Sequence, residues 1–167
     1  MSLSSIKKNV HQAEIEDFLG KLGGKHVLDA GCGDGRDVAF MLERGFKPIG
    51  VDMSDKILHI AREKVQNGIF GHADITDLEF HNAAFDGILA NCSLQYVPSE
   101  LLPQTLQGFH RVLRKDGKLL VFVPQGQEKL QKMLTDNSFR VELVKALKQQ
   151  SQVGASDSEL AIMGSKQ

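Results

Sequence analysis

Apolar residues follow two different spacings along this chain. Five short runs are almost continuously apolar, which is typical of strands that are buried on both faces: residues 25–30, 46–52, 69–74, 85–91 and 118–124. The segments before and between these runs repeat apolar residues every three to four positions, which predicts helices: residues 6–22, 36–45, 54–68 and 99–117. Strands and helices that alternate in this way predict a doubly wound α/β sheet, with mostly parallel strands and helices on both faces.

Polar residues and glycines mark the expected ends of several helices. Ser54 and Ser99 stand where N-cap side chains are expected, and Gly45 and Gly68 stand where two of the helices should stop. Pro103 falls in the first turn of the last of these helices, where a missing N–H does little harm.

The last forty residues carry a less regular pattern. Residues 128–137 have helical spacing, and residues 159–164 form a short apolar run that favours a strand. Residues 139–150 fit a strand by their β-branched content, although their apolar positions also fit a helix. We interpret this tail as a helix followed by a closing antiparallel hairpin.

Composition limits the kind of protein and its surroundings. The 167 residues suffice for one domain, and a net charge of -1 argues against a broad nucleic-acid-binding face. No apolar stretch has the length of a transmembrane helix or a signal peptide, so the expected location is the cytoplasm. Cys32 and Cys92 are then expected as reduced thiols. No Cys/His spacing is typical of zinc, so the sequence predicts no metal site.

Polar side chains stand at the carboxyl ends of four predicted strands. Asp29, Asp52, Asp74 and Asn91 each end one strand, and the acids are one strand–helix unit apart. In an open α/β sheet, ligands bind beyond these ends, so we expect the four side chains to border one crevice. A carboxylate that ends the second strand can accept hydrogen bonds from two ribose hydroxyls, which indicates an adenosine-bearing ligand.

The glycine-rich turn after the first strand narrows the choice of ligand. Gly31 and Gly33 permit close approach to the backbone, but Arg36 stands where a dinucleotide fingerprint has its third glycine. Asp34 and Asp37 add negative charge that would repel a pyrophosphate at the helix start. A nicotinamide dinucleotide is therefore disfavoured, and a ligand with a neutral or cationic polar end is favoured.

The chain resembles the class I, seven-strand family of S-adenosylmethionine-dependent methyltransferases, of small-molecule type. Five of its segments are similar to the motifs of that family, in the family's order and at its spacing, between about residues 25 and 124. These segments are VLDAGCGDGRD, IGVDMSDKILHIAREK, GHADITDLEF, FDGILANCSLQYVP and FHRVLRKDGKLLVFVP.

The resemblance implies S-adenosylmethionine as the cofactor and methyl transfer as the activity. It implies that Asp52 binds the ribose and that Asp74 and Ile75 contact adenine. Asp29 either orders the loop or meets the ligand ammonium, and Arg36 pairs either with the ligand carboxylate or with a neighbouring acid. The expected cofactor-binding residues are Asp29, Gly31, Gly33, Arg36, Asp52, Met53, Asp74, Ile75, Asn91 and Cys92.

The family's architecture also implies the organisation of the whole chain. It implies seven strands, the last two antiparallel, in a single domain over residues 1–167. Residues 1–24 would form an N-terminal helix and lid, residues 25–124 the cofactor-binding core, and residues 125–167 the closing helix and hairpin. Asn137 stands near the place of a family glycine before the sixth strand, and asparagine tolerates the same left-handed turn.

The acceptor is expected beside the loop that follows the fourth predicted strand. Gln95 and Tyr96 are the acceptor-side candidates, and no catalytic base is identified. A small-molecule acceptor is expected, with no nucleic-acid or membrane partner, and the protein is expected as a monomer or homodimer. An alternative is a module that binds S-adenosylmethionine, is inactive alone and works within a complex. Because the first and fourth strands should be neighbours, Cys32 and Cys92 are expected at the same end of the sheet.

Overall fold

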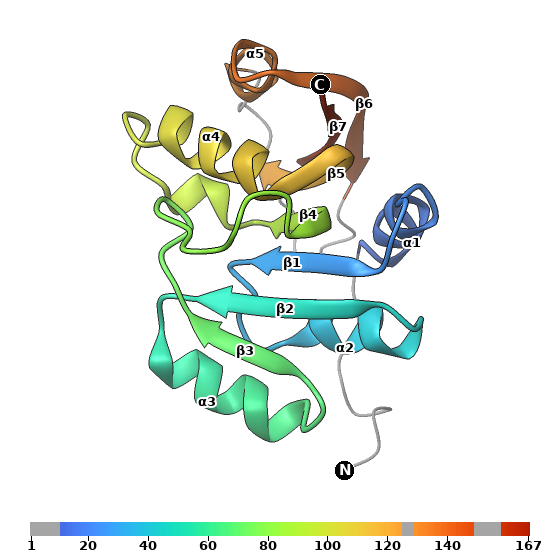
Figure 1. Cartoon of the computed structure of the whole chain (residues 1–167), viewed down its shortest axis with the longest axis vertical. Helices are drawn as coiled ribbons and strands as arrows, with labels where there is room; N and C mark the ends of the chain where they lie inside the picture. Colours follow the sequence, from blue (N-terminus) through green and yellow to red (C-terminus); the bar gives the residue numbers. More distant parts are fainter. Residues whose placement is uncertain (1–10, 125–128, 149–157) are drawn as a thin grey trace.

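A computed structural model describes residues 11–124, 129–148 and 158–167 of the chain (Figure 1). Its centre is a seven-stranded sheet in the order β3-β2-β1-β4-β5-β7-β6. The strands are β1 (His26–Ala30), β2 (Lys47–Asp52), β3 (Ile69–His72), β4 (Phe85–Asn91), β5 (Leu113–Pro124), β6 (Phe139–Lys148) and β7 (Ser158–Lys166). The helices are α1 (Gln12–Gly20), α2 (Arg36–Glu43), α3 (Asp55–Lys64), α4 (Leu102–Val112) and α5 (Lys129–Asp136), with a short 3₁₀ helix η2 (Leu94–Tyr96).

The pairing of the strands confirms the predicted sheet. β3, β2, β1, β4 and β5 are parallel to one another, whereas β7 is antiparallel to both β5 and β6. The tail is therefore the predicted antiparallel pair, and its connecting residues 149–157 lie outside the described residues. The chain moves outward from β1 to β3 and then returns to the other side of β1 with β4. This change of direction creates a switch point at the carboxyl ends of β1 and β4, where open α/β sheets bind ligands.

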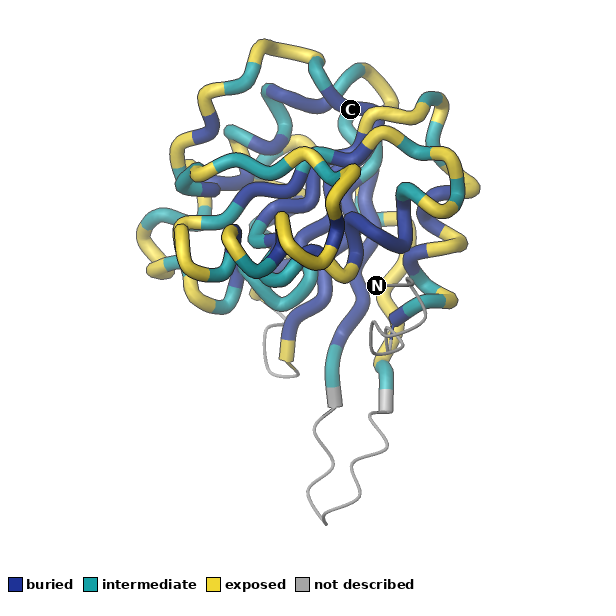
Figure 2. The backbone as a smooth tube through the Cα atoms, turned by 90° about the horizontal axis from the view of Figure 1, so that it is seen from below, coloured by how far each residue is buried: buried dark blue, intermediate teal, exposed yellow. Residues whose placement is uncertain are grey.

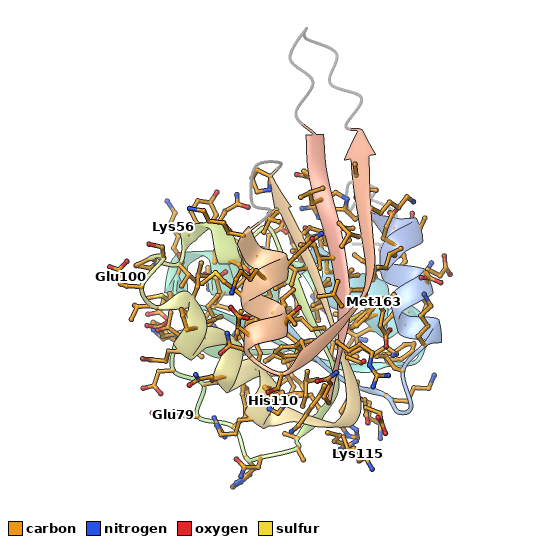
Figure 3. All side chains as sticks on the ribbon, turned by 90° about the horizontal axis from the view of Figure 1, so that it is seen from above. Lys56, Glu79, Glu100, His110, Lys115 and Met163 are labelled. Atoms are coloured by element: carbon orange, nitrogen blue, oxygen red, sulfur yellow. The ribbon has the colours of Figure 1, made fainter. Side chains whose placement is uncertain are left out.

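Helices cover both faces of the sheet, as predicted. Successive residues of a strand point to opposite faces, so Leu28 packs in one apolar cluster with α4 and α5, and Val27 packs in another with α1 and α2. A third cluster joins α2 and α3. Met163 of β7 belongs to the cluster with α1, and Figure 3 labels it beside that helix. Figure 2 shows the buried strands running between more exposed outer layers.

The ends of two helices differ in part from the prediction. Ser54 caps α3 as expected, since its Oγ accepts a hydrogen bond from the backbone N–H of Ile57 (3.3 Å), but α3 ends at Lys64 rather than at Gly68. The predicted cap at Ser99 is wrong: α4 starts after Leu101, and no side chain caps it. Pro98 and the turn that follows it occupy the residues assigned to the first turn of α4.

The turn before β6 also falls one residue later than predicted. Asn137 donates its side-chain amide to the carbonyl of Met133 (2.8 Å), and its backbone N–H also bonds to the end of α5. Because Asn137 completes the end of this helix, the left-handed residue is Ser138, with φ 65°. None of the helices in the described residues is long and apolar enough to cross a membrane.

Candidate active site

The glycine-rich turn joins β1 to α2 at the switch point. The backbone N–H groups of Gly31 and Cys32 both donate to the carbonyl of Val51 (2.9 Å each), which fixes the turn against β2. Gly31 has φ 83°, and a Cβ there would lie 2.5 Å from the Cβ of Ser93. Gly33 has φ 54° but faces open space. Gly31 is thus required by packing and conformation, and Gly33 by conformation alone.

Asp52 links the end of β2 to this turn. One carboxylate oxygen accepts from the N–H of Gly33 (3.1 Å) and the other from the N–H of Ser54 (3.0 Å). A carboxylate oxygen has two lone pairs, so each oxygen can accept one further hydrogen bond from a ligand. The neighbouring Met53 is 61% exposed, which leaves its side chain available to cover a ligand.

Asp74 and Ile75 lie just beyond β3. One oxygen of Asp74 accepts from both the backbone N–H (2.8 Å) and the hydroxyl (2.7 Å) of Thr76, which holds the turn rigidly. Gln104 of α4 donates to the carbonyl of Thr76 (2.9 Å) and ties this turn to the opposite wall. Ile75 is buried, so its side chain forms an apolar floor beside the acid.

These segments enclose a cleft of about 520 Å³, a size in the range of small-molecule sites. Seven of the predicted site residues line it: Gly31, Asp52, Met53, Asp74, Ile75, Cys92 and Tyr96. Its other lining residues are Ala73, Thr76, Ser93, Val97, Pro98 and Leu101. The predicted residues that do not line this cleft are Asp29, Gly33, Arg36, Asn91 and Gln95.

Two buried acids lie behind the glycine-rich turn. Asp29 is 1% exposed, and neither of its carboxylate oxygens accepts a hydrogen bond in the described structure. Burial raises the pKa of Asp29 well above its ordinary value, and the charges of Asp37 and Asp52 raise it further. Burial also raises the pKa of Asp37, although Asn91 donates its amide to that carboxylate (2.8 Å). Asn91 therefore contacts the acid behind the turn.

Charged residues flank the glycine-rich turn on its solvent side. Asp34 forms an ion pair with Lys64 at the end of α3 (2.6 Å). Arg36 is exposed at the first position of α2, and its positive charge opposes the raised pKa of both buried acids. The guanidinium is therefore close enough to Asp29 and Asp37 for its charge to act on both carboxyl groups.

The loop after β4 forms the other wall of the cleft. Cys92 adopts a left-handed backbone, with φ 56°, and the hydroxyl of Ser93 donates to the carbonyl of Ala30 (2.6 Å). The loop is thereby held against the glycine-rich turn. Tyr96 is 81% exposed and lines the cleft, whereas the side-chain oxygen of Gln95 is buried. Ser93 was missed by sequence reasoning, because only its contact with β1 reveals its role.

Both cysteines are free thiols at this end of the sheet, as expected. Burial raises the pKa of Cys32 far above its ordinary value, and the charges of nearby acids add to this effect. Burial, together with the charge of Glu159, raises the pKa of Cys92 to about 12. Neither thiol is activated as a nucleophile at neutral pH in the free protein.

Comparison with known proteins identifies the class. A family model described as a methyltransferase domain matches residues 27–117, so the chain belongs to this family. The sheet order, the antiparallel β7 and the glycine-rich turn are those of a class I S-adenosylmethionine-dependent methyltransferase, which confirms the predicted family.

Individual relatives agree with this assignment. The putative methyltransferase YqeM of Bacillus subtilis is 28% identical over 130 residues, which cover 75% of this chain and 51% of that protein. The chain spans about half the length of the curated relatives it matches.

Two solved structures share the fold. A S-adenosylmethionine-dependent methyltransferase from Methanosarcina mazei aligns with a TM-score of 0.82 at 16% identity, covering 92% of this chain and 96% of that chain. The 1,6-didemethyltoxoflavin-N1-methyltransferase of Burkholderia thailandensis, solved with 1,6-didemethyltoxoflavin and S-adenosylhomocysteine, aligns with a TM-score of 0.77 at 23% identity. That alignment covers 93% of this chain and 76% of that one.

Proposed function

We propose that this protein transfers a methyl group from S-adenosylmethionine to a small, partly apolar acceptor. One observation carries the proposal: the ends of β1, β2 and β3 and the loop after β4 enclose a single cleft that is polar at one wall and apolar at the other. The sulfonium of S-adenosylmethionine supplies an activated methyl group, so the protein's task is to hold the acceptor in line with it.

The acids along the cleft provide the binding groups for an adenosine. Asp52 offers a free lone pair on each oxygen to the two ribose hydroxyls, while Gly33 and Ser54 keep its carboxylate in place. Asp74 uses one carboxylate oxygen for both hydrogen bonds from Thr76, so its other oxygen can accept from the adenine. Ile75 supplies apolar contact for the flat ring. Met53 covers the same region from the solvent side.

The buried Asp29 suits the positively charged end of this cofactor. A carboxyl group that is 1% exposed and lacks a hydrogen-bond donor in the described structure gains most from a nearby ammonium group. Arg36, exposed at the start of α2, supplies a positive charge for a carboxylate. We therefore assign Asp29 and Arg36 to the amino-acid end of the cofactor.

The opposite wall of the cleft fits the acceptor. Tyr96, Val97, Pro98 and Leu101 give this wall an apolar character, and none of them carries a charge. A methyltransferase of the same fold holds 1,6-didemethyltoxoflavin, a small molecule, together with S-adenosylhomocysteine, which supports an acceptor of similar size. Residues 1–24 stay the predicted lid, and their first ten lie outside the described residues.

Binding of S-adenosylhomocysteine to Asp52→Ala tests the cofactor assignment. Two hydrogen bonds to a carboxylate, at roughly 1.5 kcal/mol each, correspond to an affinity loss of about 100-fold or more. Asp55→Asn is the matched control, since Asp55 stands three residues away, pairs with His72 and does not line the cleft. Calorimetry that gives both variants the affinity of the unmodified protein would rule out the ribose role of Asp52.

Turnover on a panel of small acceptors tests the reaction itself. Tyr96→Ala should lower the rate of methyl transfer far more than it lowers affinity for S-adenosylhomocysteine, because Tyr96 stands on the acceptor wall. Equal turnover by Tyr96→Ala and the unmodified protein on an accepted substrate would place the acceptor elsewhere.

A second candidate is a cofactor-binding module that is inactive alone. Binding of S-adenosylhomocysteine without turnover on the panel, with turnover restored by a partner protein, would support the module. Assembly as a monomer or homodimer and a cytoplasmic location stay predictions.

A further inference from the structure

Three side chains from distant parts of the chain converge behind the loop that follows β4. His11 stands just before α1, Cys92 just after β4, and Glu159 near the start of β7. One ligand atom of each residue lies within 4.8 Å of the other two. This is the one such group of three His, Cys, Asp or Glu side chains found in the described residues. Their wide separation in sequence explains why spacing alone indicated no metal site.

The distances between these atoms are close to those of a metal coordination shell. Bonds of about 2.3 Å to sulfur, 2.0 Å to nitrogen and 2.1 Å to oxygen in a tetrahedral zinc site separate S from O by about 3.6 Å and N from O by about 3.4 Å. Cys92 Sγ lies 3.6 Å from Glu159 Oε1, and His11 Nε2 lies 2.7 Å from Glu159 Oε2. The sulfur–oxygen distance matches such a site, whereas the contact between His11 and Glu159 is shorter, so an ion would require these two side chains to move apart.

The surroundings of the three ligands also suit a cation. The side chains of His11 and Glu159 are only 5% and 13% exposed. The imidazole of His11 stacks on the ring of Phe122, with 4.1 Å between the ring centroids. Although Glu159 Oε2 is in ion-pair contact with His11, it accepts no hydrogen bond from the described residues. A divalent ion would balance one thiolate and one carboxylate and would give Oε2 or Oε1 a full partner.

We propose that His11, Cys92 and Glu159 bind a divalent cation of the zinc type. One thiolate, one imidazole and one carboxylate form a ligand set that suits Zn²⁺ better than Mg²⁺ or Ca²⁺, which take oxygen ligands. Three protein ligands leave a fourth position for water or for a heteroatom of a bound molecule. Since Cys92 also lines the 520 Å³ cleft, the ion would border that cleft. The proposal does not depend on methyl transfer.

Titration of the metal-free, untagged protein with Co²⁺, and then displacement by Zn²⁺, tests this site. Co²⁺ should bind with a 1:1 stoichiometry and give a thiolate-to-cobalt absorption band in the near ultraviolet. Binding of Zn²⁺ should release roughly one proton at neutral pH, because the thiol of Cys92 must ionise. Cys92→Ser should abolish the band. Glu159→Gln should weaken binding by more than about 100-fold, which exceeds the roughly 10–100-fold typical of residues that only support a ligand.

Cys32→Ser is the matched control, since Cys32 is the second cysteine and does not belong to the cluster. It should retain the band and the affinity. Retention of the band in Cys92→Ser, or equal affinity of the unmodified protein and a Cys92→Ser/Glu159→Gln variant, would overturn the proposal and leave a simple His11–Glu159 ion pair. Circular dichroism of each variant checks folding, and Glu159→Gln keeps the test decisive if Cys92→Ser does not fold.

Discussion

Replacing Gly31 by alanine tests the closest contact in the candidate site. Gly31 has φ 83°, a left-handed conformation that costs a residue with a side chain roughly 1–2 kcal/mol. The new Cβ would also lie 2.5 Å from the Cβ of Ser93, well inside the normal carbon–carbon distance of about 3.5–4.0 Å. Ser93 cannot retreat easily, because its hydroxyl is bonded to the carbonyl of Ala30 (2.6 Å). Overpacking of this kind costs about 1–3 kcal/mol, for a total of about 2–5 kcal/mol.

The control variant is Gly45→Ala. Gly45 has a similar φ of 75°, but a Cβ there would meet nothing within 4 Å. Gly45→Ala should therefore show the backbone cost alone, and the difference between the two variants isolates the contact with Ser93. Urea unfolding should give this difference as about 1–3 kcal/mol. Ser93→Gly, combined with Gly31→Ala, should recover most of it because the clashing Cβ is removed.

Cofactor binding provides the second measurement on these variants. Gly31 lines the cleft, so Gly31→Ala should reduce the thermal stabilisation that S-adenosylhomocysteine gives, whereas Gly45→Ala should leave it unchanged. If Gly31→Ala is no more destabilising than Gly45→Ala, the loop after β4 does not press on the turn as described. If the double variant shows no recovery, the strain has another source than Ser93.

Three further changes probe charged residues that are buried or bonded to backbone carbonyls or to other side chains. Asp86→Asn should cost about 1–3 kcal/mol at pH 7, because the carboxylate accepts from the His26 N–H and from Arg114. Burial alone would raise the pKa of Asp86, but these two partners lower it below the ordinary value of about 3.9. The stability that the Asp86 carboxylate contributes is therefore lost as pH falls through this lowered pKa, and urea unfolding at low pH should show no difference between Asp86→Asn and the unmodified protein. Asp29→Asn should raise the melting temperature at pH 7 and weaken S-adenosylhomocysteine binding, since burial raises the pKa of Asp29 and its ionised form destabilises the free protein. Arg111→Ala should lower the free energy of unfolding by about 1.5–3 kcal/mol in urea, because its guanidinium bonds to the Phe80 carbonyl (2.6 Å).

The sheet was predictable because its strands are local and strongly patterned. Each parallel strand is a short apolar run between turn residues, and the helices carry clear apolar faces, so the order of elements follows from the sequence. The helix ends were less predictable. Ser99 has the right residue type for a cap, but Pro98 and the following turn compete for the same residues. Asn137 suits a left-handed turn, but its hydrogen bonds to the end of α5 keep it in the helix, and Ser138 adopts the left-handed conformation instead.

The residues of the site divide by how far their roles depend on distant contacts. Asp52 ends β2 and Asp74 follows two residues after the end of β3. The carboxyl ends of parallel strands meet at one edge of a sheet, so the place of both acids in the cleft could be predicted. The role of Ser93 depends on contact with β1, and the cluster of His11, Cys92 and Glu159 depends on α1, β4 and β7 meeting in space. No local spacing in the sequence carries that information.

The acids behind the glycine-rich turn explain how one site can prefer a cationic ligand. Burial raises the pKa of both Asp29 and Asp37, so their ionised forms destabilise the free protein. A pyrophosphate would add like charge to this region, whereas an ammonium or sulfonium group would stabilise the ionised carboxylates. Binding of a positively charged ligand would therefore offset the destabilisation that these two ionised acids cause in the unbound protein. We therefore expect the side chain of Arg36, in the place of a third glycine, to exclude dinucleotides by shape, and the buried acids to exclude them by charge.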